Sequence, residues 1–337
     1  MTPRETPRCE IAVIVPVHNA AAFLPDCLDS IAAQRFDDFC CILVDDGSTD
    51  DSPVLCDEIA QNDRRFVVIH QPQSGVSAAR TAGVRRARAE GAIWLAFCDA
   101  DDRYHPDFLR TLHTAAQDAA LPLACCRYDT FTDTAPADAP APENYKVLTA
   151  PDHLEALLHD HGVDYGLWNK LYAAGLLTEA MLDNGLAYNE DLLANWQAFL
   201  RAPGCAFCDF AGYHYRQHPD SASHRALPPQ SIDDQRRAAA LIRASVPEQW
   251  PSLQQSANAF YYEKLVYLAS MIHRRADADE YRVQLGELNI GITAGLWDPQ
   301  LGRNPRLPWS IRLAAWASIY APKFWRRICR KFLKDRQ

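Results

Sequence analysis

The sequence predicts an α/β fold in which a mostly parallel β-sheet is flanked by helices on both faces. Four apolar runs, at residues 11–15, 39–44, 66–69 and 93–97, alternate with segments of helical periodicity. Each run is continuously apolar rather than alternating with polar residues, which is typical of parallel strands buried on both faces. The repeated order of strand and helix is that of βαβ units in an open parallel sheet.

The elements between and after these runs follow from the same periodicity. Apolar residues recur at helical spacing within residues 23–31 and 76–87, which predicts one helix before the second strand and another before the fourth. Residues 132–142, rich in Ala, Pro and Asp, predict an exposed loop. The pattern is helical from residue 233 to 276 and amphipathic from Pro308 onward, which predicts a C-terminal helical extension.

Composition and charge limit the function classes. Hydrophobic residues make up 48% of the 337 residues and charged residues 23%, as in an ordinary globular protein. Residues 301–337 hold ten Lys or Arg and one acidic residue, so this segment carries +9 and the remainder of the chain −18. An acidic body without an extended basic groove argues against nucleic-acid binding, and a basic tail predicts contact with an anionic surface. No apolar run approaches the ~20 residues that cross a bilayer.

The eleven cysteines are scattered along the chain and show no disulfide framework. Their odd number and the lack of a signal-peptide pattern at the N-terminus fit a reducing cytosol, in which a buried cysteine acts as a small hydrophobic residue. We therefore expect a cytoplasmic protein whose cysteines are reduced.

An acidic cluster follows the fourth apolar run and predicts a metal site. Asp99, Asp101 and Asp102 stand at the carboxyl end of this strand, where open α/β sheets bind their ligands. Alternate carboxylates there can share a hard divalent cation that carries phosphate oxygens. Neither a glycine-rich dinucleotide fingerprint nor a P-loop is present, so a metal held by Asp99 and Asp101 is expected to neutralise a nucleoside diphosphate.

Two further segments reach the same edge of the predicted sheet. The first strand runs into residues 16–19, and the second ends in residues 45–50. Asp46 can accept a hydrogen bond from the imino N–H of a pyrimidine, although residues 45–50 are also typical of an Asx turn before a helix. Arg80 can project towards the base or a phosphate, and a surface salt bridge is the alternative.

These segments together resemble the family 2 inverting glycosyltransferases of the GT-A fold. The resemblance is carried by the order and spacing of residues 16–19 (PVHN), 44–50 (VDDGSTD), 75–80 (GVSAAR) and 99–102 (DADD). Residues 165–172 and 189–191 are similar to the bacterial cell-surface polysaccharide branch, so the resemblance covers roughly residues 10 to 220. It implies that the nucleotide sugar is bound by Pro16, His18, Asn19, Asp46, Gln73, Arg80, Asp99, Ala100, Asp101 and Arg216, with Asp46 and Arg80 reading uracil.

The resemblance also implies the catalytic and metal-binding roles. Asp101 is the expected main ligand of Mn²⁺ or Mg²⁺, Asp99 assists through ribose or water, and His218 joins the metal or a phosphate. Asp191, beside Glu190, corresponds to the catalytic base. Inverting transfer is a single displacement, which needs a base on one face of the sugar and a stabilised leaving group on the other. The alternative interpretation of the acidic pair is a helix N-terminus favoured by the macrodipole.

Two weaker predictions concern aromatic and basic side chains near these motifs. Residues 213–223 resemble the family segment that forms a lid, in which Arg216 would clamp the diphosphate; an ordinary strand and turn is the alternative. Trp168 is expected either as a wall for the acceptor sugar or as a core residue.

The tail combines bulky aromatics with cations. Aromatic and aliphatic side chains recur from Trp309 to Phe332 near one stripe, and Lys323 and several arginines occupy much of the remainder. This pattern predicts a helix lying in a membrane interface with a bend at Pro322. Packing on the protein body or on a second subunit is the alternative.

The complete prediction is an enzyme with four parts. Residues 1–110 bind the nucleotide sugar, residues 111–230 bind the acceptor and supply the base, residues 231–300 are a helical extension, and residues 301–337 associate with a membrane. The enzyme transfers a hexose or N-acetylhexosamine from a UDP-sugar to a lipid-linked glycan in capsule, lipopolysaccharide or exopolysaccharide synthesis at the inner face of the plasma membrane, as a possible homodimer. A catalytically silent glycan-binding or scaffold protein and a sugar-phosphate nucleotidyltransferase are the alternatives.

Overall fold

The computed structural model describes residues 9–159, 162–218, 228–275 and 277–332. The chain divides into two compact units, each with its own core. Within the described residues, the first unit comprises residues 9–185 and 190–218, and the second comprises residues 186–189 and 228–332 apart from residue 276. The segments 231–300 and 301–332 therefore lie in one unit.

The first unit is built on a sheet whose first half is parallel. The four apolar runs form β1 (Ile11–Val17), β2 (Phe39–Asp46), β3 (Phe66–Gln71) and β4 (Trp94–Phe97). They pair in the order β3-β2-β1-β4, and all three pairs are parallel, which confirms the prediction for this half. Every residue of β2 is buried, as its continuous apolar pattern indicates.

The second half of the sheet is mixed rather than parallel. It consists of β8 (Lys170–Ala173), β6 (Leu123–Phe131), β9 (Gly204–Arg216) and β5 (Arg103–Tyr104), with β7 (Lys146–Thr149) paired to β9. Of the pairs described here, only β6 with β9 is parallel, and the others, including β4 with β8, are antiparallel. Antiparallel neighbours need no long crossover helix, so this half lacks the βαβ rhythm.

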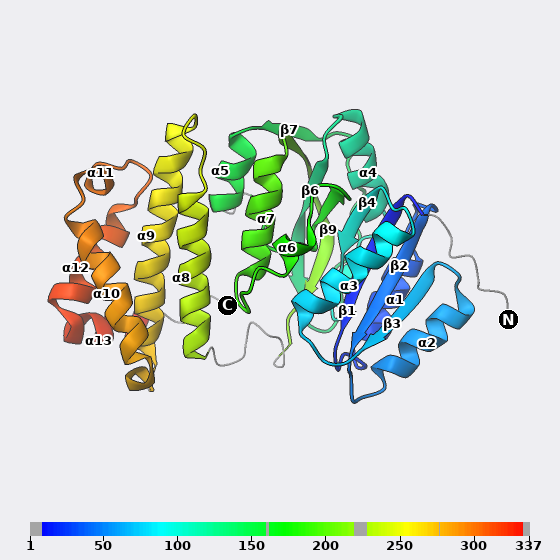
Figure 1. Ribbon diagram of the computed structural model, residues 1–337, viewed down its shortest axis with the longest axis horizontal. Helices are drawn as coiled ribbons and strands as arrows, with labels where there is room; N and C mark the ends of the chain where they lie inside the picture. The colour runs from blue at the N-terminus through cyan, green and yellow to red at the C-terminus, as the bar shows by residue number, and fades with distance from the viewer. Residues whose placement is uncertain (1–8, 160–161, 219–227, 276, 333–337) are drawn as a thin grey trace. The chain divides into compact units, whose positions relative to one another are not determined.

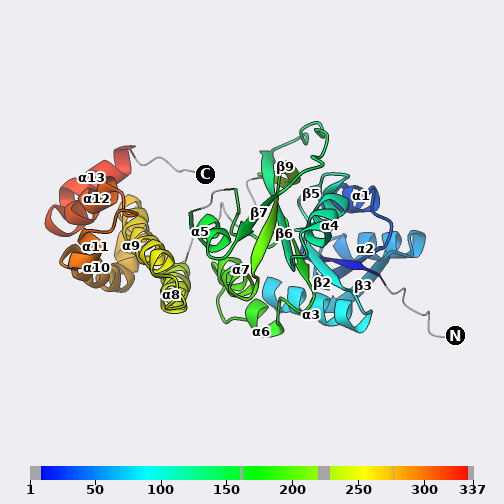
Figure 2. The same ribbon diagram turned by 90° about the horizontal axis from the view of Figure 1, so that it is seen from above.

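Helices cover both faces of this sheet, as predicted (Figures 1 and 2). The helices of the first unit are α1 (Leu24–Ala32), α2 (Ser52–Asn62), α3 (Val76–Ala89), α4 (Phe108–Asp118), α5 (Asp152–His159), α6 (Glu179–Leu182) and α7 (Glu190–Arg201). Val13 and Val15 of β1 share a core cluster with residues of α1 and α4. Ile14 points to the other face, where α3 approaches so closely that a Cβ at Gly83 would lie 2.4 Å from Ile14 Cγ2. The predicted loop 132–142 contains neither helix nor strand.

The second unit is helical. It contains α8 (Pro229–Ala244), α9 (Pro251–Arg274), the 3₁₀ helix Ala278–Tyr281, α10 (Arg282–Leu296), α11 (Pro299–Gly302), α12 (Trp309–Tyr320) and α13 (Pro322–Phe332). The region predicted as helical, residues 233–276, is formed by two helices, α8 and α9. The chain breaks between them at Pro247 and restarts with Pro251 in the first turn of α9, where the missing N–H of proline costs no hydrogen bond. Its core joins residues from Ile232 to Ala315. None of the described helices is long and apolar enough to cross a membrane.

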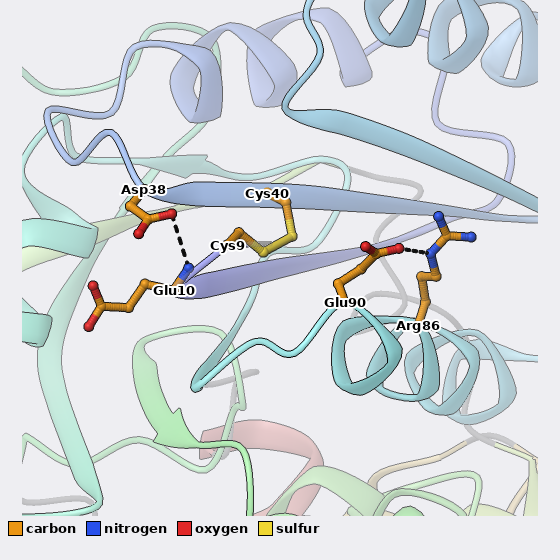
Figure 3. The surroundings of a disulfide bond; sticks show 6 residues. All are labelled: Cys9, Glu10, Asp38, Cys40, Arg86 and Glu90. Atoms are coloured by element: carbon orange, nitrogen blue, oxygen red, sulfur yellow. Dashed lines mark hydrogen bonds and ion pairs between the residues drawn. A yellow bond between two sulfur atoms is a disulfide. The ribbon is translucent and has the colours of Figure 1, made fainter. Parts of the chain in front are cut away.

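One disulfide corrects the prediction that all cysteines are reduced. Cys9, just before β1, is bonded to Cys40 of β2, and their Cα atoms are 5.6 Å apart (Figure 3). These residues are 31 positions apart and become neighbours only because β1 and β2 pair, so their spacing carried no signal. The other nine cysteines are free and buried, as small hydrophobic residues would be.

Candidate active site

The predicted pocket residues at the ends of β1 and β2 lie together. Parallel strands present their carboxyl ends at one edge, so the residues after β1 meet those after β2. Nδ1 of His18 is 3.0 Å from the carbonyl oxygen of Asp46, and Nε2 of Gln73 is 3.2 Å from Nε2 of His18. Asn19 accepts a hydrogen bond on Oδ1 from the backbone N–H of Thr49. Pro16, on β1, pairs with Val44 of β2 at the same edge.

Asp46 shapes the loop that closes this corner. Its Oδ1 accepts from Gln71 Nε2 and from the backbone N–H of Ser74, and its Oδ2 accepts from the N–H of Gly75. Three of the roughly four acceptor positions of the carboxylate are thus used, which leaves one on Oδ2. Gly47 takes a positive φ of 67°, and a Cβ there would lie 2.7 Å from Gln73 N, so only glycine fits.

Arg80 gathers three carboxylates from two distant segments. It lies in the second turn of α3, and its residue is only 5% exposed, so the predicted alternative of a surface salt bridge is wrong. Nη1 lies 2.5 Å from Asp191 Oδ1 and 3.4 Å from Glu190 Oε1, while Nη2 lies 3.1 Å from Asp99 Oδ1. The guanidinium therefore joins the loop after β4 to the first turn of α7.

The environment of Asp191 favours its neutral form. Burial is the largest cause that raises the pKa of this carboxyl, and the charges of Glu190 and Asp99 also raise it. Arg80 opposes them, and the net result is a pKa of about 8. Burial likewise raises the pKa of Asp99. The side chains of Asp191 and Asp99 keep 21% and 29% of their surface accessible, so a substrate can still reach them.

The predicted base stands at the start of α7, so the helix N-terminus interpretation of the acidic pair is confirmed, and the role of Asp191 as the base stays a prediction. Glu190 and Asp191 form the first turn, whose free N–H groups and positive dipole end favour carboxylates. Asn184 Nδ2 donates to the carbonyl oxygen of Glu190 and fixes this turn. The apolar residues that follow are buried and anchor the helix.

The three aspartates after β4 have different partners. Asp99 contacts Arg80, Asp101 Oδ2 lies 3.0 Å from His218 Nε2, and Asp102 is fully buried. Asp102 accepts from Tyr213 Oη at 2.6 Å and from the backbone N–H of Arg216 at 2.7 Å, so it fastens β9 to this loop. Ala100 lies buried among them.

Asp101 and His218 are the side chains best placed to hold a cation. A carboxylate and an imidazole suit Mn²⁺, and a carboxylate alone suits Mg²⁺. Within the described ranges no group of three His, Cys, Asp or Glu side chains is close enough to hold a metal. The donor set therefore fits a divalent ion only if phosphate oxygens complete its coordination.

Arg216 does not face an open diphosphate site. Its Nη2 lies 2.7 Å from Asp26 Oδ2, its Nε donates to the carbonyl oxygen of Asp101, and its guanidinium lies over the ring of Phe131. Residues 213–216 are part of β9 and form an ordinary strand, the alternative that the sequence left open. The remainder of the predicted lid, residues 219–223, lies outside the described residues.

The comparison with protein families matches residues 12–166 to the model of glycosyl transferase family 2. This range contains the loops after β1, β2 and β4 and Arg80, whereas the first turn of α7 lies beyond it. Residues 12–166 form a family 2 glycosyltransferase domain.

Curated relatives agree with this family. The chain is 32% identical to the uncharacterized glycosyltransferase EpsJ of Bacillus subtilis over 216 residues, and 32% identical to the putative glycosyltransferase EpsH of that organism over 226 residues. These alignments cover 63% and 66% of this chain, but only 62% and 64% of the relatives' own length.

Among solved structures, S. aureus TarS superposes with a TM-score of 0.66 at 16% identity, covering 97% of this chain and 56% of TarS. TarS 1–349 in complex with UDP-GlcNAc has a TM-score of 0.55 at 17% identity, covering 84% and 92% of the two chains. A mannosyltransferase from Pyrobaculum calidifontis in complex with GDP-Man and Mn²⁺ has a TM-score of 0.54 at 14% identity, covering 96% and 90%. The fold is the GT-A fold.

The roles of some aromatic side chains in the first unit could not be identified from the sequence. Trp168, predicted as an acceptor wall or a core residue, is buried, with its ring stacked on Tyr213 at 4.4 Å, so the core alternative holds. Tyr128 packs edge-on against Trp168 and is the exposed ring of this aromatic group. Tyr213 was the clearest omission, and its only signal was its place at the start of residues 213–216 (YHYR), the segment that contains Arg216.

Proposed function

We propose that the protein transfers a hexose or N-acetylhexosamine from a UDP-sugar to a glycan acceptor with inversion at the anomeric carbon. The observation that carries this proposal is the contact of Arg80 with both Asp99 and Asp191, which brings the predicted donor site and the predicted base together. TarS, a structural neighbour, is known in complex with UDP-GlcNAc, and the neighbouring mannosyltransferase is known with GDP-Man and Mn²⁺.

In this proposal the donor occupies the edge formed by the loops after β1, β2 and β4. Uracil lies near His18 and Gln73 and uses the acceptor position that remains on Asp46 Oδ2. Arg80 has a different role from the one that the resemblance implies. Because its guanidinium is engaged by three carboxylates, it positions Asp191 rather than reading the base.

Asp191 is the general base. It takes the proton of the acceptor hydroxyl as this oxygen attacks the anomeric carbon, and the bond from that carbon to the diphosphate breaks on the opposite face. A raised pKa suits this role, because a base is most effective when its pKa lies near the working pH. A divalent ion held by Asp101 and His218, with Asp99 nearby, would supply Lewis-acid stabilisation of the departing UDP.

The acceptor in this proposal is a lipid-linked glycan of a bacterial capsule, lipopolysaccharide or exopolysaccharide. The similarity of residues 165–172 and 189–191 to the polysaccharide branch supports it. Tyr128 supplies an exposed aromatic face on the acceptor half of the sheet, where a sugar ring can stack.

The experiment measures UDP release from a panel of UDP-sugars with a glycan acceptor, with and without EDTA. We expect metal-dependent release of UDP, loss of transfer in Asp191→Asn, and unchanged transfer in Asp209→Asn, whose carboxylate forms a surface ion pair with Arg127. Release of pyrophosphate would indicate the nucleotidyltransferase, and absence of turnover with every donor would indicate the scaffold. Full activity of Asp191→Asn would refute the assignment of the base.

A further inference from the structure

The helices α10, α12 and α13 form an outer layer of the second unit. They pack against α9, and α10 also contacts α8 (Figures 1 and 2). The large apolar side chains of α12 at positions 309, 313, 316 and 320 are exposed, and Trp309 is 75% exposed. Their spacing of three and four residues places them on one side of the helix, and exposed Phe324 of α13 follows. We call these five side chains the outer face.

The opposite side of α12 and α13 packs inward. Ala315 and Ser318 of α12 are buried, and so is Cys329 of α13. Trp325 Nε1 donates to Ser270 Oγ of α9 at 3.3 Å. Packing on the protein body, the alternative that the sequence left open, is therefore true of one side of the tail. This packing does not cover the outer face, whose five side chains stay exposed among the described residues of this unit.

A stripe on α10, which the sequence analysis missed, enlarges this surface. Val283, Ile290 and Trp297 recur every seven residues, and Ile290 and Trp297 are each 74% exposed. A groove of about 600 Å³ separates α10 from the junction of α12 and α13, and it is lined by Gly286, Asn289, Ile290, Thr293, Ala294, Ser318, Ile319 and Pro322. The groove shows that Ile290 of the stripe lies beside the C-terminal end of α12 and the start of α13.

The charge of this layer is uniformly positive at its C-terminal end. Residues 299–332 contain eight Lys or Arg and no acidic residue, whereas the chain before residue 301 has a net charge of −18. Lys323 immediately precedes Phe324 in the chain, Arg327 follows it by three residues, and both are exposed. A two-fold interface between copies of this face would place these cations against themselves, which disfavours self-association there.

We propose that the outer face, with the α10 stripe, docks on the surface of an anionic lipid bilayer. Exposed tryptophan and tyrosine rings partition into the headgroup region, where the apolar part of the ring is buried and its polar atom stays hydrated. Neighbouring cations are drawn to anionic headgroups. The layer lies on the membrane rather than through it, since no described helix can span one. This inference does not depend on the proposed glycosyl transfer.

The test is sedimentation of the full chain, without nucleotide, with vesicles of phosphatidylcholine alone and of phosphatidylcholine mixed equally with phosphatidylglycerol. Strong binding is expected only to the mixed vesicles. The charge variant Lys323→Gln/Arg327→Gln should bind them roughly 25-fold more weakly, since each cation near the surface contributes about fivefold. The aromatic variant Trp309→Ser/Phe324→Ser should lose binding even at low salt.

A matched control carries Arg237→Gln and Leu241→Ser on α8, where both side chains are also exposed. It should bind the mixed vesicles as the wild type does, and all variants should keep the wild-type circular dichroism and melting temperature. The proposal would be overturned if the wild type failed to bind the mixed vesicles or bound both vesicle types equally. Binding of the aromatic variant at the wild-type level would also overturn it. A dimer in sedimentation equilibrium that the aromatic variant abolishes would also overturn it, in favour of a second copy as occupant.

Discussion

Replacing Arg80 by glutamine tests whether one guanidinium holds the site together. Arg80 is 5% exposed and contacts Asp99, Glu190 and Asp191, whose side chains are 16–29% accessible. Removing one partner from a buried ion pair costs about 3–5 kcal/mol, because the other charge is left unpaired. Solvent reaches these carboxylates in part, so we expect the lower end, about 3 kcal/mol.

The expected shift in melting temperature follows from the size of the first unit. For a domain of this size each kcal/mol corresponds to roughly 2–4 °C, so Arg80→Gln should melt about 6–12 °C below the wild type near neutral pH. Arg85→Gln is the matched control, since Arg85 lies on the same helix and pairs with Glu179 at the surface. The free energy of unfolding of Arg85→Gln should stay within about 0.5 kcal/mol of the wild type. The measurement is differential scanning calorimetry of both variants.

The pH dependence separates charge from packing. Arg80 lowers the pKa of Asp191 against the raising effects of burial and neighbouring carboxylates, so its removal raises this pKa further. Protons bound by the folded variant then stabilise it. The difference in melting temperature between Arg80→Gln and the wild type should therefore shrink as the pH falls and be largest at alkaline pH. A deficit that is the same at every pH would indicate lost packing only. A melting temperature equal to that of Arg85→Gln would refute the account of the cluster.

Three further predictions use other parts of the site. The pKa of Asp191 is raised to about 8, so kcat/KM should fall about tenfold for each pH unit below it and reach a plateau above it. A flat pH-rate profile of UDP release would contradict this. Mn²⁺ with UDP should raise the melting temperature of the wild type but not of Asp101→Ala, because a ligand stabilises only the state that binds it; equal shifts in thermal denaturation would place the metal elsewhere. Tyr213→Phe should cost about 1–3 kcal/mol in chemical denaturation, because buried Asp102 loses a donor; an unchanged midpoint would show that the bond contributes nothing.

The sequence predicted the half of the fold in which neighbours in the chain are neighbours in space. Strands β1 to β4 are continuous apolar runs joined by helices, so their parallel pairing follows from local pattern. The strands beyond β4 pair across long separations, and β9 contacts β5, β6 and β7. No local pattern encodes such pairing, so the mixed pairing of the second half could not be predicted from the sequence.

The same reasoning explains which site residues could be predicted. His18, Asp46 and Asp99 lie at the carboxyl ends of strands that were predicted to be parallel, so their common edge was predictable. Asp191 entered only by resemblance, because 111 residues separate it from Arg80. A basic residue in the first turns of a helix predicts a charge that seeks an anion, but not that protein carboxylates already occupy it. The contacts of Arg80 with protein carboxylates were therefore not predictable, and they are why we propose that Arg80 positions Asp191 instead of contacting uracil.

The tail shows a related limit of periodicity. A helical stripe distinguishes two sides of a helix, but it does not say which side the protein covers. The sequence placed Trp316 and Trp325 in one membrane-facing stripe, whereas Trp325 donates to Ser270 and Trp316 stays exposed. Pro322 accounts for the difference, since it begins a new helix after Ala321 and resets the phase of the stripe. The surface available to a bilayer is therefore set by packing on α9, and it includes an α10 stripe that no tail-based pattern contains.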